Sequence, residues 1–468
     1  MNIQKAVAKL IEQKSDKFIA LSDNIWDVPE LHFEEHQSST YLIDALEEEG
    51  FQVERGVAGL ETAFVGSYGS GKPVVAILGE FDALAGLSQK KGLSHPEPVA
   101  DGGNGHGCGH NLLGTGAFAA AVAIKEYLES NQVQGTVRFY GCPAEENGSG
   151  KAIMTSAGLF DDADVALSWH PWDVPGLMNL RTLANYSARF KFQGKSAHAA
   201  AAPHLGRSAL DAVELMNVGV NYLREHMVPE ARIHYAVTDT GGASPNVVQA
   251  NAEVVYLIRA PEKDEVKSLY KRVHDIARGA ALMTGTTFEV EFVGTASNLI
   301  PNSVLAGVMH ENLMKVELPS YDDKDLEFAN EIRATLSEAD LNNAYAGLDR
   351  ETVKKLKEKA IADVIPPLSP TEAVLSGSTD VGDVSWVVPT MQCLTTCFAI
   401  GTPLHTWQVV SQGATPIAHK GMLHAGKVIA ATAIQLMENP SLIEQAKAEL
   451  QERLDGKTYD SLIPESVK

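Results

Sequence analysis

The sequence has few cysteines and few basic residues for its length. Only 4 of its 468 residues are cysteine, too few for a disulfide-stabilised scaffold and typical of a reducing, cytoplasmic compartment. Lys and Arg number 38 against 60 Asp and Glu, which gives a formal net charge of −22. Because such a surface repels phosphate backbones and anionic lipids, neither a nucleic acid nor a membrane is an expected partner.

Long apolar runs are also missing. No segment approaches the roughly 18 apolar residues that cross a bilayer, and residues 1–20 form a mixed-charge helical pattern without a signal-peptide core. The hydrophobic share of 44% and the charged share of 21% are ordinary for a packed protein. Composition therefore predicts an acidic, globular, cytoplasmic protein and names no activity.

Short apolar runs predict buried strands in much of the chain. They lie at residues 74–78, 136–140, 165–167 and 393–400. Helical patterns separate the first three, notably at residues 112–128. This alternation favours an α/β domain with a mostly parallel sheet.

The pattern changes near Arg181, where polar and apolar residues begin to alternate. The expected order is β-α-β-β-α-β, a ferredoxin-like α+β unit, with strands at 188–193, 232–238, 253–259 and 287–293 and helices at 208–226 and 263–283. We therefore predict a catalytic domain in two parts, residues 1–183 and 297–468. Residues 184–296 form an inserted domain that serves dimerisation or acts as a lid.

A glycine-rich turn contains three potential metal ligands within five residues. It reads His106-Gly-Cys108-Gly-His110-Asn111, and glycine lets a backbone fold tightly around a small ion. Asn111 is expected to cap the helix that follows. Taken alone, the turn is better explained as a structural loop with one buried thiol than as a metal site.

Other polar residues follow the ends of the apolar runs. Asp82, the pair Glu145-Glu146, His170 and His405 each have this position, and ligands of open α/β sheets bind at the carboxyl ends of the strands. In an adjacent carboxylate pair, one member can ligate a metal while the other accepts a proton. The Cys, His and Glu donors suit zinc or manganese, and five donors exceed the needs of one tetrahedral ion. Two divalent ions are therefore expected.

Six segments together resemble a known family of dinuclear metallohydrolases, which includes aminoacylase, carboxypeptidase G and the auxin-conjugate amidohydrolases of plants. The segments are His106–Asn111, Cys142–Lys151, Ser168–Pro171, Gly194–Ser208, Ser376–Ser385 and Gly401–Gln408. The resemblance covers nearly the whole chain. It implies the split catalytic domain and the inserted domain described above.

The resemblance also implies residue roles. Glu145 matches the general base, and Asp82 matches an acidic residue that supports the site. The metal ligands that it implies are Cys108, His110, Glu146, His170 and His405. The chain has Glu80 where the aminoacylase branch has a histidine, which fits the branch that uses a cysteine ligand.

Further roles fall in the inserted domain. His198 matches a histidine that reaches the active site of a dimer partner, and Asn246 matches an asparagine that contacts the substrate carboxylate or the oxyanion. A substrate carboxylate needs a cation, for which Arg259, Arg207 and Lys151 are candidates. The sequence does not choose among the three.

The expected activity is metal-dependent hydrolysis of an N-acyl or N-aroyl amino acid such as p-aminobenzoyl-glutamate, with two Mn²⁺ or Zn²⁺ ions. A dipeptidase or aminoacylase with the same site is the alternative. Two other classes stay open: a catalytically silent metal-binding or dimerising protein, and a thiol redox protein using Cys393 and Cys397. A homodimer is expected, and the family likeness also allows a related partner subunit.

Overall fold

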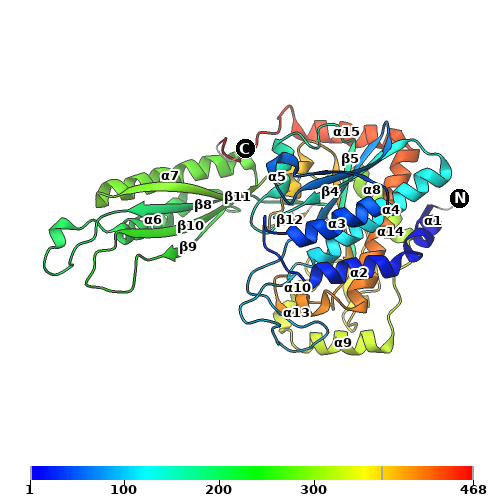
Figure 1. Ribbon diagram of the computed structural model, residues 1–468, viewed down its shortest axis with the longest axis horizontal. Helices are drawn as coiled ribbons and strands as arrows, with labels where there is room; N and C mark the ends of the chain where they lie inside the picture. Colours follow the sequence, from blue (N-terminus) through cyan, green and yellow to red (C-terminus); the bar gives the residue numbers. More distant parts are fainter. Residues whose placement is uncertain (1–2, 370–372, 466–468) are drawn as a thin grey trace. The chain divides into compact units, whose positions relative to one another are not determined.

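The computed structural model describes residues 3–369 and 373–465, which fold as two compact units (Figure 1). One unit consists of Met1–Leu180, Ile300–Ala373 and Val384–Tyr459. The other consists of Arg181–Leu299, Val374–Asp383 and Asp460–Lys468. The chain thus leaves the first unit and returns to it, and short later segments join the second.

The first unit is built on a seven-stranded sheet with the order β1-β2-β4-β3-β5-β13-β6. The neighbours among β3, β4, β5 and β13 pair in parallel, whereas β1, β2 and β6 add antiparallel edges. The predicted mostly parallel sheet is therefore confirmed. The strand bounds are Gln52–Arg55 (β1), Phe64–Ser70 (β2), Val74–Glu80 (β3), Gly135–Cys142 (β4), Val165–Trp172 (β5), Gly176–Leu177 (β6) and Thr390–Thr396 (β13).

Helices cover this sheet, and α4 (His110–Asn131) and α14 (Pro416–Glu438) form the centre of the core. Both are rich in alanine and glycine, so their backbones approach closely; a Cβ at Gly426 would lie 3.2 Å from the carbonyl oxygen of Gly116. The remaining helices are α1 (Ile3–Glu12), α2 (Ser15–Trp26), α3 (His36–Glu48), α5 (Gly150–Ser156), α8 (Ser303–Lys315), α9 (Asp323–Arg333), α10 (Glu338–Ala344), α11 (Arg350–Leu356), α12 (Val381–Ser385), α13 (Trp407–Gln412) and α15 (Pro440–Leu454).

Two local predictions are wrong. The strand expected at residues 393–400 is β13, which ends at Thr396, because the N–H groups of Cys397 and Phe398 turn to donate to the carbonyl of Trp172. The buried apolar loop that follows has the composition of a strand but not its pairing. Asn111 does not cap α4: Gly109 precedes the helix, and the Asn111 amide instead donates to Ser22 Oγ and the carbonyl of Gly413.

The second unit has the predicted β-α-β-β-α-β order. Its antiparallel sheet runs β11-β8-β10-β9, with α6 and α7 on one face (Figure 1). Phe190 and Tyr256 are buried beneath these helices, whereas Arg189 and Lys191 lie beside Glu291 on the other face. The bounds are Ala184–Gln193 (β8), Ala209–Leu223 (α6), Arg232–Asp239 (β9), Asn251–Ala260 (β10), Lys263–Thr284 (α7) and Thr287–Ala296 (β11).

Short elements complete the description. The strands β7 (Leu180–Thr182) and β12 (Ala373–Leu375) pair with each other. Single 3₁₀ turns occur at Val57–Gly59, Pro203–Leu205 and Arg224–His226. Across residues 3–369 and 373–465, every helix is too short or too polar to cross a bilayer.

The contact between α4 and Trp169 of β5 supports a test of the core. A Cβ at Gly116 would lie 2.6 Å from the Trp169 ring, so Gly116→Ala should lower the free energy of unfolding by about 1–3 kcal/mol through overpacking. Gly307→Ala in α8 is the control, because nothing lies within 4 Å of its added Cβ, and it should be neutral or slightly stabilising. Urea unfolding measures both variants, and equal effects would contradict the packing argument.

Candidate metal and catalytic site

Potential ligands from distant parts of the chain meet at the carboxyl edge of the first unit's sheet. They come from the turn before α4, from the ends of β3, β4 and β5, and from the loop before α13. The side chains form three groups, and within each group the donor atoms lie within 4.8 Å of one another. The groups are Cys108 with His110 and His170, Cys108 with Glu146 and His405, and Glu80 with His110 and Glu145. Cys108 belongs to two of these groups, so its sulfur lies close to the donor atoms of both.

The glycines of the turn are needed for its close packing. Gly109 has a φ of +79° and lies directly before α4, in a region of backbone space that favours glycine. A Cβ at Gly107 would lie 2.4 Å from a methyl carbon of Leu87. The carbonyl of Gly107 also accepts the N–H of His405 at 2.8 Å, so the turn that carries Cys108 holds the loop that carries His405.

Asp82 orients two of the candidate ligands at once. Its Oδ1 lies 2.8 Å from His110 Nδ1, and its Oδ2 accepts the backbone N–H of Glu146 at 2.9 Å. Burial disfavours the charged carboxylate, but His110 and the Glu146 N–H outweigh it and hold the pKa of Asp82 below its usual value. The ring of His110 therefore presents Nε2 to the cluster, as second-shell carboxylates do for metal-bound histidines.

His170 is oriented in the same manner by a different partner. Its Nδ1 lies 2.8 Å from the carbonyl oxygen of Pro171, and its Nε2 faces Cys108 Sγ at 3.4 Å. Across the cluster, His405 Nε2 lies 3.3 Å from Glu146 Oε2. His405 has a φ of +61°, an uncommon conformation for a residue with a Cβ, and such backbone positions concentrate at functional sites.

The chemistry of these donors fits divalent metal ions. His110 Nε2 and Glu146 Oε1 are buried and have no hydrogen-bond partner, which is costly unless a cation contacts them. Burial and the nearby charge of Glu146 raise the pKa of the Cys108 thiol well above its usual value. A bound cation reverses this effect, because a coordinating thiol is deprotonated. The mixed sulfur, nitrogen and oxygen donors suit zinc.

Glu35 also contributes to the site, although sequence reasoning missed it. It is buried, and its two oxygens accept the backbone N–H of Ala144 at 2.8 Å and the hydroxyl of Thr62 at 3.0 Å. Ala144 has a φ of +58° and immediately precedes Glu145. Glu35 therefore holds the turn from which Glu145 and Glu146 extend. No pattern in the sequence links residue 35 to residue 144, so only the fold reveals this contact.

The three basic side chains predicted as candidates for binding a substrate carboxylate have different surroundings. Lys151 is fully buried, and its Nζ lies 2.8 Å from Glu80 Oε1; this geometry gives no support to a role in capturing a substrate carboxylate. Arg259 is half-buried and donates to Ser378 Oγ at 2.8 Å, and burial lowers its pKa. Arg207 is exposed and donates to the carbonyl of Gly206 at 2.6 Å.

His198 and Asn246 lie in the second unit and are both exposed. They are 48 positions apart in sequence but adjacent in space, since the N–H of Ala199 donates to the carbonyl of Asn246 at 2.9 Å and His198 bridges to Val247. The fold thus gathers the two residues expected to contact the substrate or its oxyanion at one place on this unit.

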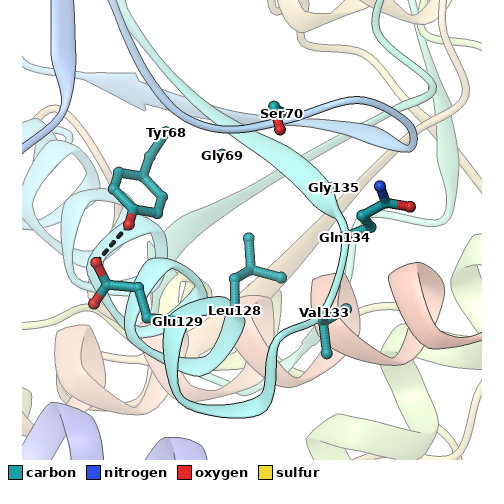
Figure 2. Close-up of a pocket in the computed structure, with 8 residues that line it drawn as sticks. All are labelled: Tyr68, Gly69, Ser70, Leu128, Glu129, Val133, Gln134 and Gly135. Carbon is teal, nitrogen blue, oxygen red and sulfur yellow. Dashed lines mark hydrogen bonds between the residues drawn. The ribbon is translucent and has the colours of Figure 1, made fainter.

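A separate hollow lies at the opposite edge of the first unit's sheet. Its lining includes Gly135, which begins β4, whereas Glu145 and Glu146 follow the end of that strand. Figure 2 shows the Tyr68 hydroxyl directed at Glu129, with an O–O distance of 2.5 Å. This hollow contains none of the predicted ligands and is distinct from the candidate site.

Comparison with known proteins identifies the family. The model of peptidase family M20/M25/M40 matches residues 76–406, and the chain belongs to this family. It is a hydrolase that acts on amide bonds. The chain is 52% identical to one of the subunits of p-aminobenzoyl-glutamate hydrolase from Escherichia coli (strain K12), over 99% of this chain and 98% of that protein. It is 31% identical to the Xaa-Arg dipeptidase of Mus musculus, over 97% and 93%.

Solved structures show the same fold. A crystal structure of the aminobenzoyl-glutamate utilization protein of Klebsiella pneumoniae aligns with a TM-score of 0.54 and 17% identity, over 70% of this chain and 90% of that one. A dinuclear metal-binding M20 peptidase of Bacillus subtilis aligns with a TM-score of 0.53 and 16% identity, over 91% and 99%.

The burial of Glu35 makes a prediction about pH. Burial, with the nearby charge of Asp82 adding to it, raises the pKa of Glu35 from 4.5 to about 7. Between these two values the folded state binds more protons than the unfolded state, so this group's contribution to stability falls as pH rises. Glu35→Gln removes the titration. In metal-stripped protein, the free energy of unfolding of Glu35→Gln relative to the wild type should therefore increase as pH rises, by at most about 1.4 kcal/mol per pH unit.

Urea unfolding from pH 4.5 to pH 7 measures this difference. Glu34→Gln, at the exposed neighbouring residue, controls for placing an amide in this turn. A Glu35→Gln difference that is constant across the range would contradict the prediction.

Proposed function

We propose that this hydrolase is metal-dependent and cleaves the amide bond of an N-acyl or N-aroyl amino acid such as p-aminobenzoyl-glutamate. The observation that carries the proposal is the cluster of Cys108, His110, Glu146, His170 and His405, with Glu145 within 4.8 Å of His110. The 52% identity to the p-aminobenzoyl-glutamate hydrolase chain of Escherichia coli, over nearly the whole of both proteins, supports this choice of substrate.

The five ligands would hold two divalent ions, Mn²⁺ or Zn²⁺, with Cys108 shared between the two donor groups. Such ions polarise an amide carbonyl and lower the pKa of water when they are bound. Glu145 accepts the proton of the attacking water and delivers it to the leaving amine. Asp82 keeps His110 in the tautomer that presents Nε2, and Glu35 holds the backbone from which Glu145 extends.

Residues of the second unit supply the remaining polar contacts. His198 and Asn246 would donate to the oxyanion or bind the substrate carboxylate, which stabilises charge that develops during reaction. Arg259 and Arg207 remain candidate partners for that carboxylate. Both lie in the same unit as His198.

The enzyme is proposed to act as a homodimer in which His198 serves the active site of the partner. The edge strand β9 supports this, because its Tyr235 and Val237 are each 41% exposed and an uncovered strand edge readily pairs with another chain.

A related but different partner chain is also proposed, since this chain is 28% identical over 254 residues to another of the p-aminobenzoyl-glutamate hydrolase subunits of Escherichia coli (strain K12). The low cysteine content supports a cytoplasmic location.

Dipeptide hydrolysis is the second candidate activity. The 31% identity to the Xaa-Arg dipeptidase over 97% of this chain favours it specifically. The thiol redox alternative loses support, because Cys393 and Cys397 are fully buried. Burial raises the pKa of Cys397 to about 12 and also raises that of Cys393, whereas reactive thiols are accessible and have lowered pKa values.

Glu145→Gln tests the role of the base. It should lower kcat at least about a hundredfold while leaving metal content unchanged, because the ligands remain. The assay follows hydrolysis of p-aminobenzoyl-glutamate, acetyl amino acids, indole-acetyl conjugates and dipeptides. Glu129→Gln, in the hollow of Figure 2 at the other edge of the sheet, is the matched control. Undiminished turnover in Glu145→Gln would exclude the mechanism.

Mixing two inactive variants tests the shared active site. If His198 acts on the partner, a dimer of His198→Ala and Glu145→Gln chains contains one intact site. Refolding an equal mixture should then restore about a quarter of wild-type activity, because half the dimers are mixed and each has one working site. Activity no higher than that of the separate variants would rule out action across the dimer.

A further inference from the structure

The last residue of β5 is a tryptophan that the function proposed above does not use. Successive side chains of a strand point to opposite faces, so Trp172 lies on the same face of β5 as His170, whereas Trp169 lies on the other face. Trp169 is fully buried, and its indole N–H donates to the carbonyl of Leu113 at 2.9 Å. Trp172 is half-buried. Core packing thus accounts for Trp169, and Trp172 has part of its surface left for another contact.

Trp172 lies directly beside a candidate metal ligand. Its ring centroid is 5.8 Å from that of His170, with an angle of 78° between the ring planes. Two residues along a strand cover roughly 7 Å, so Trp172 lies beyond His170 toward the carboxyl edge of the sheet, where the donor atoms gather. The sheet itself closes the other side of these donor atoms. Trp172 is therefore on the side from which a substrate reaches them.

The backbone of this tryptophan is held firmly in the sheet. The carbonyl of Trp172 accepts the N–H of Cys397 at 2.8 Å and that of Phe398 at 3.3 Å, and Trp172 is paired with Thr396 of β13. An aromatic surface that is fixed before a ligand binds loses little conformational freedom in binding it. The indole is thus suited to contact a second flat group.

The chemistry of the proposed substrate provides such a group. In an aroyl amide the aromatic ring is bonded directly to the carbonyl carbon, so a substrate whose carbonyl is polarised at the cluster carries its ring next to the ligands. Aromatic rings attract one another when their centroids are about 4.5–7 Å apart, and the indole is already at such a distance from His170. An acetyl group has one methyl in the same place and no ring face to stack.

We propose that Trp172 contacts the acyl group of the substrate and makes the site prefer flat aromatic acyl groups to short aliphatic ones. The inference rests on the proposed function and names the class of substrate that the site selects. Trp172 takes no part in the chemical step, because it contacts a part of the substrate that does not react. The competing explanation is that the indole only supports the ring of His170.

Substrate selectivity separates the two explanations. Wild type, Trp172→Leu and Trp172→Phe are compared on p-aminobenzoyl-glutamate and acetyl-glutamate, which share the leaving amino acid, and the Zn²⁺ content of each protein is measured. Trp172→Leu should lower kcat/KM for the aroyl substrate about 3–10-fold more than for the acetyl substrate, the range expected for one lost aromatic pair. Trp172→Phe keeps a ring and should retain most of the preference. Zn²⁺ content should stay unchanged in both variants.

A second comparison assigns the contact to the acyl side of the scissile bond. With p-aminobenzoyl-aspartate in place of p-aminobenzoyl-glutamate, the ring is the same and only the leaving amino acid differs, so Trp172→Leu should slow both substrates by the same factor. Trp386→Leu is the control for loss of an indole. Trp386 is 4% exposed and packs in a cluster with Ile300, Leu450 and Leu454, so its loss should lower Tm without changing the ratio of aroyl to acetyl turnover.

Three results would overturn the inference and leave the proposed function standing. If Trp172→Leu slows the aroyl and acetyl substrates equally and loses Zn²⁺, the indole only supports His170. If it keeps its Zn²⁺ and the wild-type ratio, the indole does not touch the acyl group. If the effect depends on the leaving amino acid instead, the contact is on the amine side. Should the wild type hydrolyse none of these N-acyl amino acids, the proposed function and this inference fail together.

Discussion

The site depends on the hydrogen bonds of one buried carboxylate, that of Asp82. One of its oxygens fixes the ring of His110, and the other accepts the backbone N–H of Glu146, so a single side chain links the turn before α4 to the turn after β4. Because Asp82 follows the central strand β3, it transmits the rigidity of the sheet to two ligands. Catalysis by metal ions requires this, since ligand groups must be held in place before the ions and substrate bind.

The surrounding structure extends the same principle. Glu35 holds the Ala144 turn, Gly107 holds His405, and Pro171 holds His170. In each case a residue that would touch no substrate fixes the direction of one that would. The cost is a concentration of buried carboxyl groups, which burial alone would drive toward the neutral form. Divalent ions bound at the proposed site would, together with Lys151, offset this concentration of negative charge.

The sequence was most informative where the chemistry is local. The proposed ligands Cys108 and His110 lie within one glycine-rich turn, and Glu145, Glu146 and His170 follow apolar runs that are indeed strands. Their residue types and their shared place after strands were sufficient to predict that they meet. The strand prediction was wrong where a buried loop has the apolar composition of a strand. Residues 397–400 are apolar and buried but lie outside β13. Sequence reasoning also failed where a polar residue serves a distant partner, as Asn111 does for Gly413.

The sequence by itself determined the fold class and the family and indicated the candidate ligands, because strand periodicity, turn glycines and the types of residue that bind metals are properties of short segments. Only the tertiary structure decided which neighbouring group holds the second nitrogen or oxygen of each side chain in the site. It placed Lys151 against Glu80, Glu35 against the turn at Ala144, and Cys108 in two groups of donor atoms. These are contacts between segments far apart in the chain, and their geometry depends on how the sheet and its helices pack, which no local pattern encodes.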